Sequence, residues 1–467
     1  MRIFIGLSDV SGYYYHLSKG FEDLGVQANL VTLVDHRFEY SDKVAKRPGG
    51  VWLRFARWSL TKRQQATGQV KARLWFAVML LARAFLLAWA IVRHDVFILS
   101  CGNSFFRFRE FVLLRLLGKR IIYVFHGTDE RAAFLDGFAE DIHLPEQFRT
   151  GSGFLPPLDQ VKDTETRRAV LEAYRKLTLQ RRATVLAVER HADVIIGNPA
   201  SAHHHQRAYV KFCYIGLPFA PNASARSKHN DGTAAAGRKL MVVHSPSYPL
   251  GKGSDELRAS LERVCGSLDA IEYVEIRDRP NREVLEYLAR CDFAMDQLYS
   301  DTPMAGFAVE AAFFGKPAVV GGYYADHIEK DYDPGLIPPT SFCFPEAIDA
   351  AIEKLVKDAH HRREIGNAAR EFVQNHWTAR HCAEKYLRII DSDPPKEWMC
   401  DPMDCRYVGG MGLPRARLIE IIRSLNDTYG QQVFCLDDKP ELLAELLALA
   451  SASPIGQKSA NMEGESS

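Results

Sequence analysis

Short apolar runs alternate with amphipathic stretches along most of the chain. The first run, Arg2 to Leu7, is apolar at nearly every position, as expected for a strand buried in a parallel sheet. A helical pattern from Tyr13 to Leu24 follows, and an apolar run from Val26 to Leu33 completes a strand–helix–strand unit. Similar units recur up to residue 390, so the sequence predicts an α/β fold of parallel sheets covered by helices.

One such unit in the second half carries candidate chemistry. A strand from Cys291 to Leu298 leads through a tight turn into a predicted helix from Phe307 to Phe314. Gly315 and Pro317 end that helix. The free N–H groups at its start can bind phosphate, and Glu310, one turn in, can bind a pair of sugar hydroxyls. The alternative is that Glu310 only compensates the helix dipole.

A second phosphate-binding element precedes this unit. The apolar run Lys239 to His244 ends in polar residues that include Ser247, and Lys252 lies just before another predicted helix. A lysine beside a helix N-terminus gives a diphosphate one point charge and several backbone donors. We therefore expect His244, Ser247 and Lys252 near the same ligand, although a solvated loop lysine is the alternative.

Two strand ends in the first half carry further candidates. Gly12 closes the loop after the first strand, but this single glycine does not match the three-glycine dinucleotide motif, and a simple turn explains it equally well. The strand Arg120 to Phe125 ends at His126. Ligands gather outside the carboxyl ends of strands in open α/β sheets, so His126 is a candidate for contact with substrate; a structural histidine is the alternative.

The region from Lys43 to Arg93 is basic, aromatic and free of acidic residues. Its last part, Leu74 to Val92, is apolar on nearly every face, with Arg83 in the middle. Three interpretations stay open: a membrane-spanning helix, a helix buried in the domain, and a helix resting on an anionic membrane surface. The eleven basic residues are Lys43, Lys46, Arg47, Arg54, Arg57, Lys62, Arg63, Lys71, Arg73, Arg83 and Arg93.

Composition sets wider limits. The length of 467 residues predicts two or three domains, and a net charge of +1 indicates no partner. Nine scattered cysteines favour a reducing compartment. The N-terminus begins with a strand and lacks the pattern of a signal peptide, so we expect a cytoplasmic protein. Asp331 and Asp333 precede a proline in a predicted loop rather than ending a strand, and we expect no metal site there.

Several of these motifs resemble retaining glycosyltransferases with the GT-B fold, near glycosyltransferase family 4. The donor-site motif of that family is a turn, Gly-x-x-x-Glu and then Gly-Lys-Pro, matched here by Gly306 to Glu310 and by Gly315 to Pro317. Lys252-Gly253 and the segment around His126 are also similar. Many members carry a second glutamate eight residues before the first, and Thr302 occupies that position here.

The resemblance implies two Rossmann-like domains that face a central cleft. The expected organisation is an acceptor domain over 1–219, a linker over 220–238, a nucleotide-sugar donor domain over 239–375, and a helix over 376–390 that crosses back to the first domain. Residues 391–467 lie outside the resemblance; their role is not assigned, and their end is expected to be disordered.

The implied activity is transfer of a hexose from a nucleotide sugar, with retention, to a glycan or lipid-linked acceptor, as in polysaccharide biosynthesis. The resemblance implies catalytic roles for His126, Lys252 and Glu310 and no metal cofactor. The residues expected to contact the donor are Gly12, His244, Ser247, Lys252, Gly306, Phe307, Ala308 and Glu310. A nucleotide-sugar epimerase and a non-catalytic membrane-surface adaptor are the alternatives; nucleic acid is not an expected partner.

Overall fold

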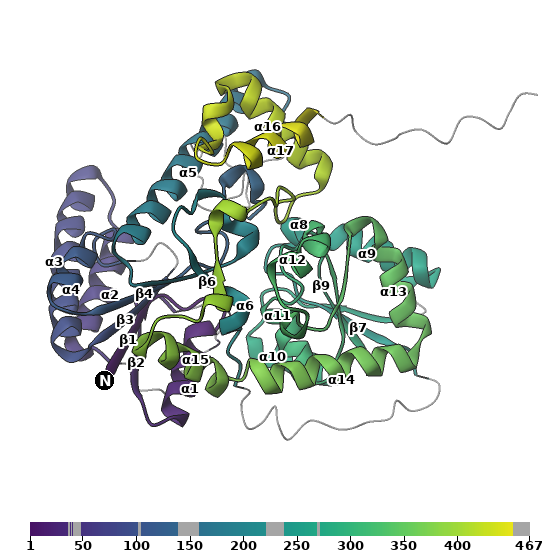
Figure 1. Cartoon of the computed structure of the whole chain (residues 1–467), viewed down its shortest axis with the longest axis horizontal. Coiled ribbons are helices and arrows are strands. Elements are labelled where there is room, and N and C mark those ends of the chain that lie inside the picture. Colours follow the sequence, from purple (N-terminus) through teal and green to yellow (C-terminus); the bar gives the residue numbers. More distant parts are fainter. Residues whose placement is uncertain are drawn as a thin grey trace, which may run out of the picture.

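The computed structural model describes residues 1–35, 38, 40, 48–100, 104–138, 158–220, 238–268 and 271–451. They form two α/β domains that lie side by side, each built on one sheet (Figure 1). The predicted GT-B arrangement of two Rossmann-like domains with a helical C-terminal region is confirmed. Most of the predicted linker, residues 221–237, lies outside the described residues.

The first domain is built on a seven-stranded sheet with the order β12-β6-β5-β4-β3-β1-β2. Its central strands are apolar and buried on both faces, which fits a parallel sheet covered by helices. The parallel strands are β1 (Arg2–Leu7), β2 (Gln27–Thr32), β3 (Val96–Ser100), β4 (Arg120–Val124), β5 (Val194–Gly197) and β6 (Tyr209–Lys211). The associated helices are α1 (Tyr13–Asp23), α4 (Glu110–Leu116), α5 (Thr164–His191) and α6 (Phe212–Ile215).

The second domain is built on a five-stranded parallel sheet with the order β11-β10-β9-β7-β8. Its strands are β7 (Met241–His244), β8 (Glu272–Glu275), β9 (Phe293–Gln297), β10 (Ala318–Gly321) and β11 (Ser341–Cys343). Its helices are α8 (Pro249–Lys252), α9 (Ser254–Cys265), α10 (Asn281–Arg290), α11 (Gly306–Phe313), α12 (Ile328–Asp331), α13 (Ile348–Lys357) and α14 (Ala359–His376).

After α14 the chain returns to the first domain. Helix α15 (Ala379–Asp391) packs on α1 so closely that a Cβ at Gly20 would lie 1.9 Å from the carbonyl oxygen of Ala379. The hydroxyls of Tyr13 and Tyr386 are 3.0 Å apart across this contact. A glycine at position 20 is therefore what lets the two helices approach.

The segment after α15 is folded up to residue 451. Among the described strands, β12 (Met399–Cys400) alone runs antiparallel, and it extends the first sheet beside β6. Helices α16 (Arg415–Tyr429) and α17 (Pro440–Ser451) lie near α5 (Figure 1). In the segment between β12 and α16, the N–H group of Met411 donates to the carbonyl of Leu135 in the first domain. Gly412 N–H donates to the carbonyl of Tyr299 in the second, so this segment joins both domains.

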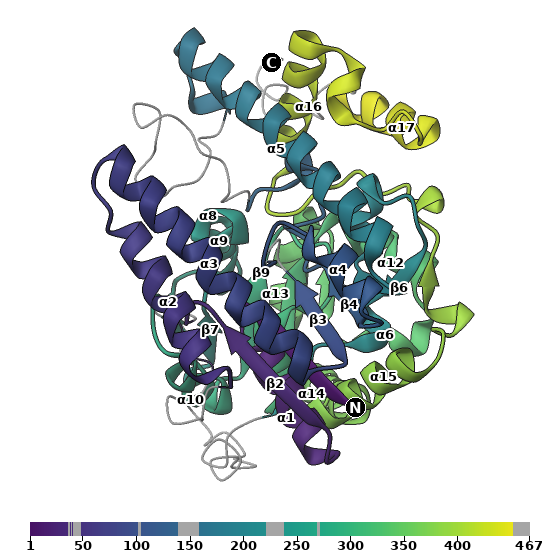
Figure 2. The same cartoon turned by 90° about the vertical axis from the view of Figure 1, so that its left-hand side faces the viewer.

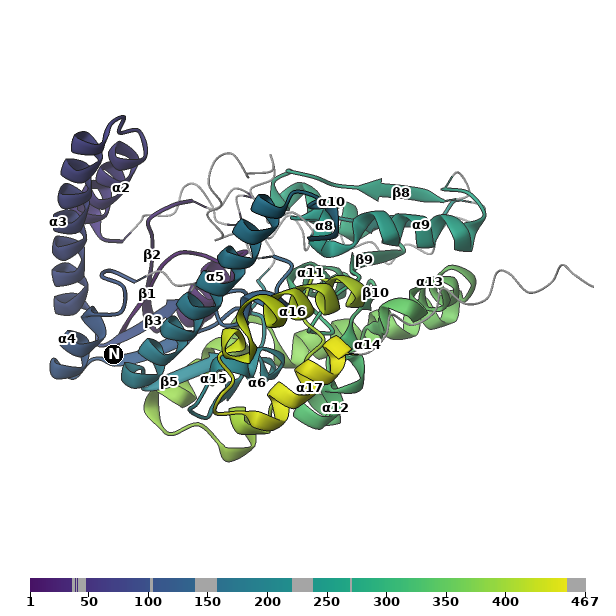
Figure 3. The same cartoon turned by 90° about the horizontal axis from the view of Figure 1, so that it is seen from above.

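A helical hairpin is inserted between β2 and β3. Its helices, α2 (Gly50–Gln64) and α3 (Gln69–Arg93), pack against each other at the end of the molecule farthest from the second domain (Figures 2 and 3). Helix α3 is long and apolar enough to cross a membrane, and 28% of its most apolar window is buried. One face of α3 is buried and the other is exposed, so the helix is not buried on every side.

Candidate functional site

Two hollows lie between the domains at the carboxyl ends of their strands. The C-side hollow, about 210 Å³, is lined mainly by the second domain, including Ser247, Lys252, Asn281, Gly306, Phe307 and Glu310. The N-side hollow, about 220 Å³, is lined by residues of both domains, including Tyr13, His126, Arg131, Asn198, Asp301 and Met411. Both are lined by Ser11, Ala305, Gly306 and Glu310, so they meet at the start of α11.

Helix α11 places Glu310 at this junction. Ala305 is extended at the N-cap position, and Gly306 begins the helix without a side chain in the way. Glu310 is only 7% exposed, and the side-chain amide of Asn281 donates to its Oε1 at 2.6 Å. Burial raises the pKa of the Glu310 carboxyl to about 8. This carboxyl is therefore largely protonated at neutral pH, and not the charged group that a hydroxyl-binding glutamate suggests.

Lys252 lines the C-side hollow and forms an ion pair within the protein. Its Nζ is 3.0 Å from Oδ1 of Asp296, at the buried end of β9. The second oxygen of that carboxylate has no hydrogen-bond partner in the part of the chain that the structure describes. Lys252 ends α8, and Gly253, in the left-handed region, packs against Leu298, where a Cβ would lie 2.7 Å from the leucine side chain. This tight turn holds the lysine at the carboxyl ends of the strands in the second sheet.

Other predicted donor contacts lie around this hollow, but not all face it. Ser247 and Phe307 line the hollow, whereas Ala308 is buried in the core behind it. His244 is also buried behind the wall, where its ring nitrogens contact the carbonyl of Met295 at 2.7 Å and the hydroxyl of Ser254 at 2.8 Å. Burial lowers its pKa to about 4, so this neutral ring supports Ser254.

Gly12 occupies a turn rather than the wall of either hollow. It is left-handed, with φ of 79°, and is the N-cap of α1. The ring of Tyr40 would contact a Cβ added here at 3.0 Å. The neighbouring Ser11 is the residue of this loop that reaches both hollows.

His126 lines the N-side hollow just after β4, as predicted from its place in the sheet. Its Nε2 shares a hydrogen bond of 2.9 Å with the hydroxyl of Tyr14, and its backbone N–H donates to Asp129. Burial lowers the pKa of His126 to about 3, so the ring is neutral at physiological pH. A neutral imidazole can accept a hydrogen bond here, but with so low a pKa it is a weak base and does not supply positive charge.

A buried ion network in the N-side hollow was missed by sequence reasoning. Arg131 pairs with Asp301 across the domains and with Asp136 at 3.4 Å, and Arg181 reaches Asp136 at 2.8 Å. Burial alone would lower the pKa of Arg131, but the two carboxylates outweigh burial and raise it. Asp301 directly precedes Thr302, so an acidic group stands one residue away from the missing second glutamate.

Comparisons with known proteins give structural neighbours only. No family model matches the chain, and no curated protein matches it. HepE of Anabaena, solved with UDP and glucose, is 13% identical over 84% of this chain and 99% of that chain, with a TM-score of 0.44. The spinosyn rhamnosyltransferase SpnG is 12% identical over 83% and 100%, with a TM-score of 0.38. The glycosyltransferase SnogD of Streptomyces nogalater is 12% identical over 83% and 98%, with a TM-score of 0.37. Likeness this distant does not transfer an activity.

Proposed function

We propose that this protein is a glycosyltransferase that binds a nucleotide sugar in the C-side hollow and an acceptor in the N-side hollow. The observation that carries the proposal is the junction of the two hollows at Gly306 and Glu310. One hollow offers Lys252 and the start of α11 for a diphosphate. The other offers His126 to an approaching hydroxyl. A sugar bound at this junction would contact both the donor site and the acceptor site.

In this reaction the bond between the anomeric carbon and the diphosphate breaks, the acceptor oxygen bonds to that carbon, and the proton of the acceptor hydroxyl passes to the departing diphosphate. The departing diphosphate gains negative charge, which Lys252 and the N–H groups of α11 stabilise. Lys252 can serve this purpose only if it turns from Asp296 toward the phosphate. His126, held by Tyr14, accepts a hydrogen bond from the acceptor hydroxyl. Retention of configuration and hexose transfer belong to the proposal through the family resemblance.

Glu310 is proposed to hold donor hydroxyls. Two hydroxyl donors at its carboxyl favour the ionised form, because hydrogen bonds to a charged acceptor stabilise the charge. Donor binding should then remove the proton from this carboxyl. The pKa of about 8 makes this change measurable near neutral pH.

We further propose that the acceptor is a glycan or a lipid-linked sugar and that the protein works at the cytoplasmic face of a membrane. Aromatic rings of Tyr13 and Phe212 line the N-side hollow and suit the apolar face of a sugar. The exposed apolar residues of α3 support a membrane location.

The direct test is a thermal-shift screen of nucleotide sugars against the full chain. A ligand that binds the native state raises the melting temperature by mass action. UDP-glucose, present in one HepE structure, is a practical first member of the panel. Stabilisation by one nucleotide sugar supports the proposal, whereas stabilisation by none favours the membrane adaptor. Release of an epimerised free sugar without acceptor would identify an epimerase instead.

Metal independence is part of the proposal, because Lys252 and backbone donors take the place of a cation at the diphosphate. Transfer activity should be unchanged in excess EDTA. A loss of activity in EDTA that manganese restores would refute metal independence without refuting transfer itself.

A further inference from the structure

A stripe of exposed apolar side chains runs the length of α3. Its members recur every three or four residues, which places them on one face of a helix. They are Val70, Leu74, Ala77, Leu81, Ala84, Phe85, Ala88 and Val92. Every residue of this stripe is apolar, and Val70 is 81% exposed. A contiguous apolar surface of this length marks an interaction site.

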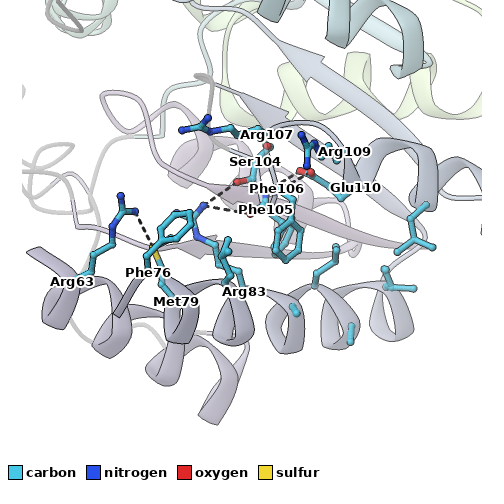
Figure 4. Close-up of a pocket in the computed structure, with 16 residues that line it drawn as sticks. Arg63, Phe76, Met79, Arg83, Ser104, Phe105, Phe106, Arg107, Arg109 and Glu110 are labelled. Carbon is cyan, nitrogen blue, oxygen red and sulfur yellow. Dashed lines mark hydrogen bonds between the residues drawn. The ribbon is translucent and has the colours of Figure 1, made fainter. Parts of the chain in front are cut away.

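A groove of about 930 Å³ opens along the edge of this stripe, between α3 and the segment 104–113 (Figure 4). Ala84 and Ala88 belong both to the stripe and to the groove, so the two surfaces are continuous. The apolar wall of the groove is formed by Phe76, Met79, Leu80, Leu87, Ile91 and Leu113.

The groove combines this apolar wall with an excess of positive charge. Arg63, Arg83, Arg107 and Arg109 line it, against a single acid, Glu110. The carboxylate of Glu110 accepts hydrogen bonds from the backbone N–H groups of Phe105 at 2.8 Å and Phe106 at 3.0 Å (Figure 4). It therefore holds the segment in place. Among the described residues, none of the four arginines forms an ion pair.

Arg83 is the central arginine of the groove. Its Nη1 makes two long contacts, 3.5 and 3.4 Å, with the carbonyl oxygens of Ser104 and Phe105. A guanidinium has five N–H donors, so most of its donors lack a partner among the described residues. Burial, followed by the nearby charge of Arg63, lowers the pKa of Arg83, and the carboxylate of Glu110 opposes this only in part. An unpaired cation in a half-buried apolar groove is expected to bind an anion.

We propose that this groove binds an anionic phospholipid of the membrane on which α3 rests. The headgroup phosphate would lie on Arg83 and Arg109, because guanidinium groups bind phosphate in a bidentate manner. An acyl chain would follow the apolar wall, and the stripe would enter the bilayer surface alongside it. The proposal does not depend on the donor site and stands whether or not the protein transfers sugars.

The packing of α3 determines how it meets the membrane. Its opposite face is buried in the first domain through Met79, Ala82, Leu86, Leu87 and Ala90. A spanning helix would have to give up these contacts, whereas a helix lying in the membrane surface keeps them. The groove and the stripe therefore favour an in-plane orientation.

A soluble short-chain lipid tests the groove without a membrane. Dihexanoyl phosphatidylglycerol, kept below its micelle concentration, is titrated into the full chain by calorimetry. We expect saturable binding, stronger than that of dihexanoyl phosphatidylcholine or inorganic phosphate. Arg83→Gln should weaken it roughly ten- to a hundredfold, the range for lost hydrogen bonds to a charged group. Arg109→Gln gives a second test should Arg83→Gln fail to fold.

The matched control is Arg93→Gln, which removes the same charge from an exposed site on α3 outside the groove. It should leave binding of the short-chain lipid unchanged. Equal losses for Arg83→Gln and Arg93→Gln would reduce the effect to general electrostatics and overturn the proposal. If inorganic phosphate binds as tightly as the short-chain lipid, the groove binds anions without recognising lipid, and the proposal is overturned. Absence of lipid binding in a chain that light scattering shows to be dimeric would assign the stripe to a second copy.

Vesicle flotation then separates the stripe from the groove. Leu81→Asp, on the stripe, should abolish binding to vesicles that contain phosphatidylglycerol and leave short-chain lipid binding intact. Arg83→Gln should weaken both. If Leu81→Asp leaves vesicle binding unchanged, the stripe does not enter the bilayer, and this part of the proposal fails.

Discussion

The two sides of the cleft hold their charged groups in different ways. On the second domain, Lys252 and Glu310 each have a single polar partner among the described residues, Asp296 and Asn281, which a ligand can replace. On the first domain, Arg131 is fixed by carboxylates from both domains in a fully buried network. The difference indicates that the donor side exchanges partners on binding, whereas the N-side network holds the domains together. Removing a charged group should mainly weaken ligand binding on the donor side and mainly lower the free energy of unfolding on the N-side.

The largest effect is expected at Arg131. Arg131→Met leaves Asp301 buried without its cation, and breaking a buried pair from one side costs about 3–5 kcal/mol. Chemical denaturation should show that loss in the free energy of unfolding. The double variant Arg131→Met/Asp301→Leu removes both charges and should recover part of it. Equal stability of wild type and Arg131→Met would show that the network does not fasten the domains.

Lys252→Ala should lower kcat by about a hundred- to a thousandfold, the range for one group that stabilises developing negative charge. The value of kcat/KM should fall with it, because the contact strengthens in the transition state. Lys330→Ala, on the exposed face of α12, is the control and should be fully active.

The variant Lys252→Ala also leaves Asp296 buried and unpaired, so stability must be followed separately. Adding Asp296→Asn should restore the melting temperature without restoring kcat. Recovery of both the melting temperature and kcat would show that Lys252 has a structural role only.

A smaller effect concerns the pH dependence of stability, measured without added donor. The folded-state pKa of Glu310, about 8, exceeds its ordinary value of 4.5. The protonated carboxyl therefore favours folding below pH 4.5, and that contribution is lost as pH rises through 8. Glu310→Gln keeps the neutral shape, so its melting temperature should exceed that of wild type by a margin that grows from pH 5 to pH 9. A glutamate that only compensates the helix dipole predicts a lower melting temperature for this variant.

Much of this architecture follows from local sequence. Apolar runs such as Arg2 to Leu7 indicate buried strands, and Gly315 with Pro317 correctly ends α11 near Phe313. The position of Glu310 at the start of that helix is also a local property. Helices α16 and α17 in the tail also coincide with stretches of helical apolar periodicity.

The remainder depends on contacts between distant segments. Arg131 and Asp301 are 170 positions apart, so no local spacing indicates their pairing. The protonation of Glu310 arises from burial, and the hydrogen bond donated by Asn281, on another helix, partly opposes it. Strand β12 has two residues and is too short to give a periodic pattern. Hydropathy of α3 does not reveal which face the domain covers, and the expected roles of His126, Lys252 and Glu310 stay predictions until they are measured.

The most direct test is calorimetric titration of the full chain at pH 7 with the nucleotide sugar selected by the thermal-shift screen. If donor hydroxyls bind the Glu310 carboxylate, wild type should release on the order of one proton per donor, seen by comparing buffers of different ionisation enthalpy. Glu310→Gln should release none and bind roughly ten- to a hundredfold more weakly. Glu256→Gln, an exposed change on α9, should behave as wild type. Unchanged donor affinity in Glu310→Gln, with the same proton release as wild type, would contradict the assignment of this site.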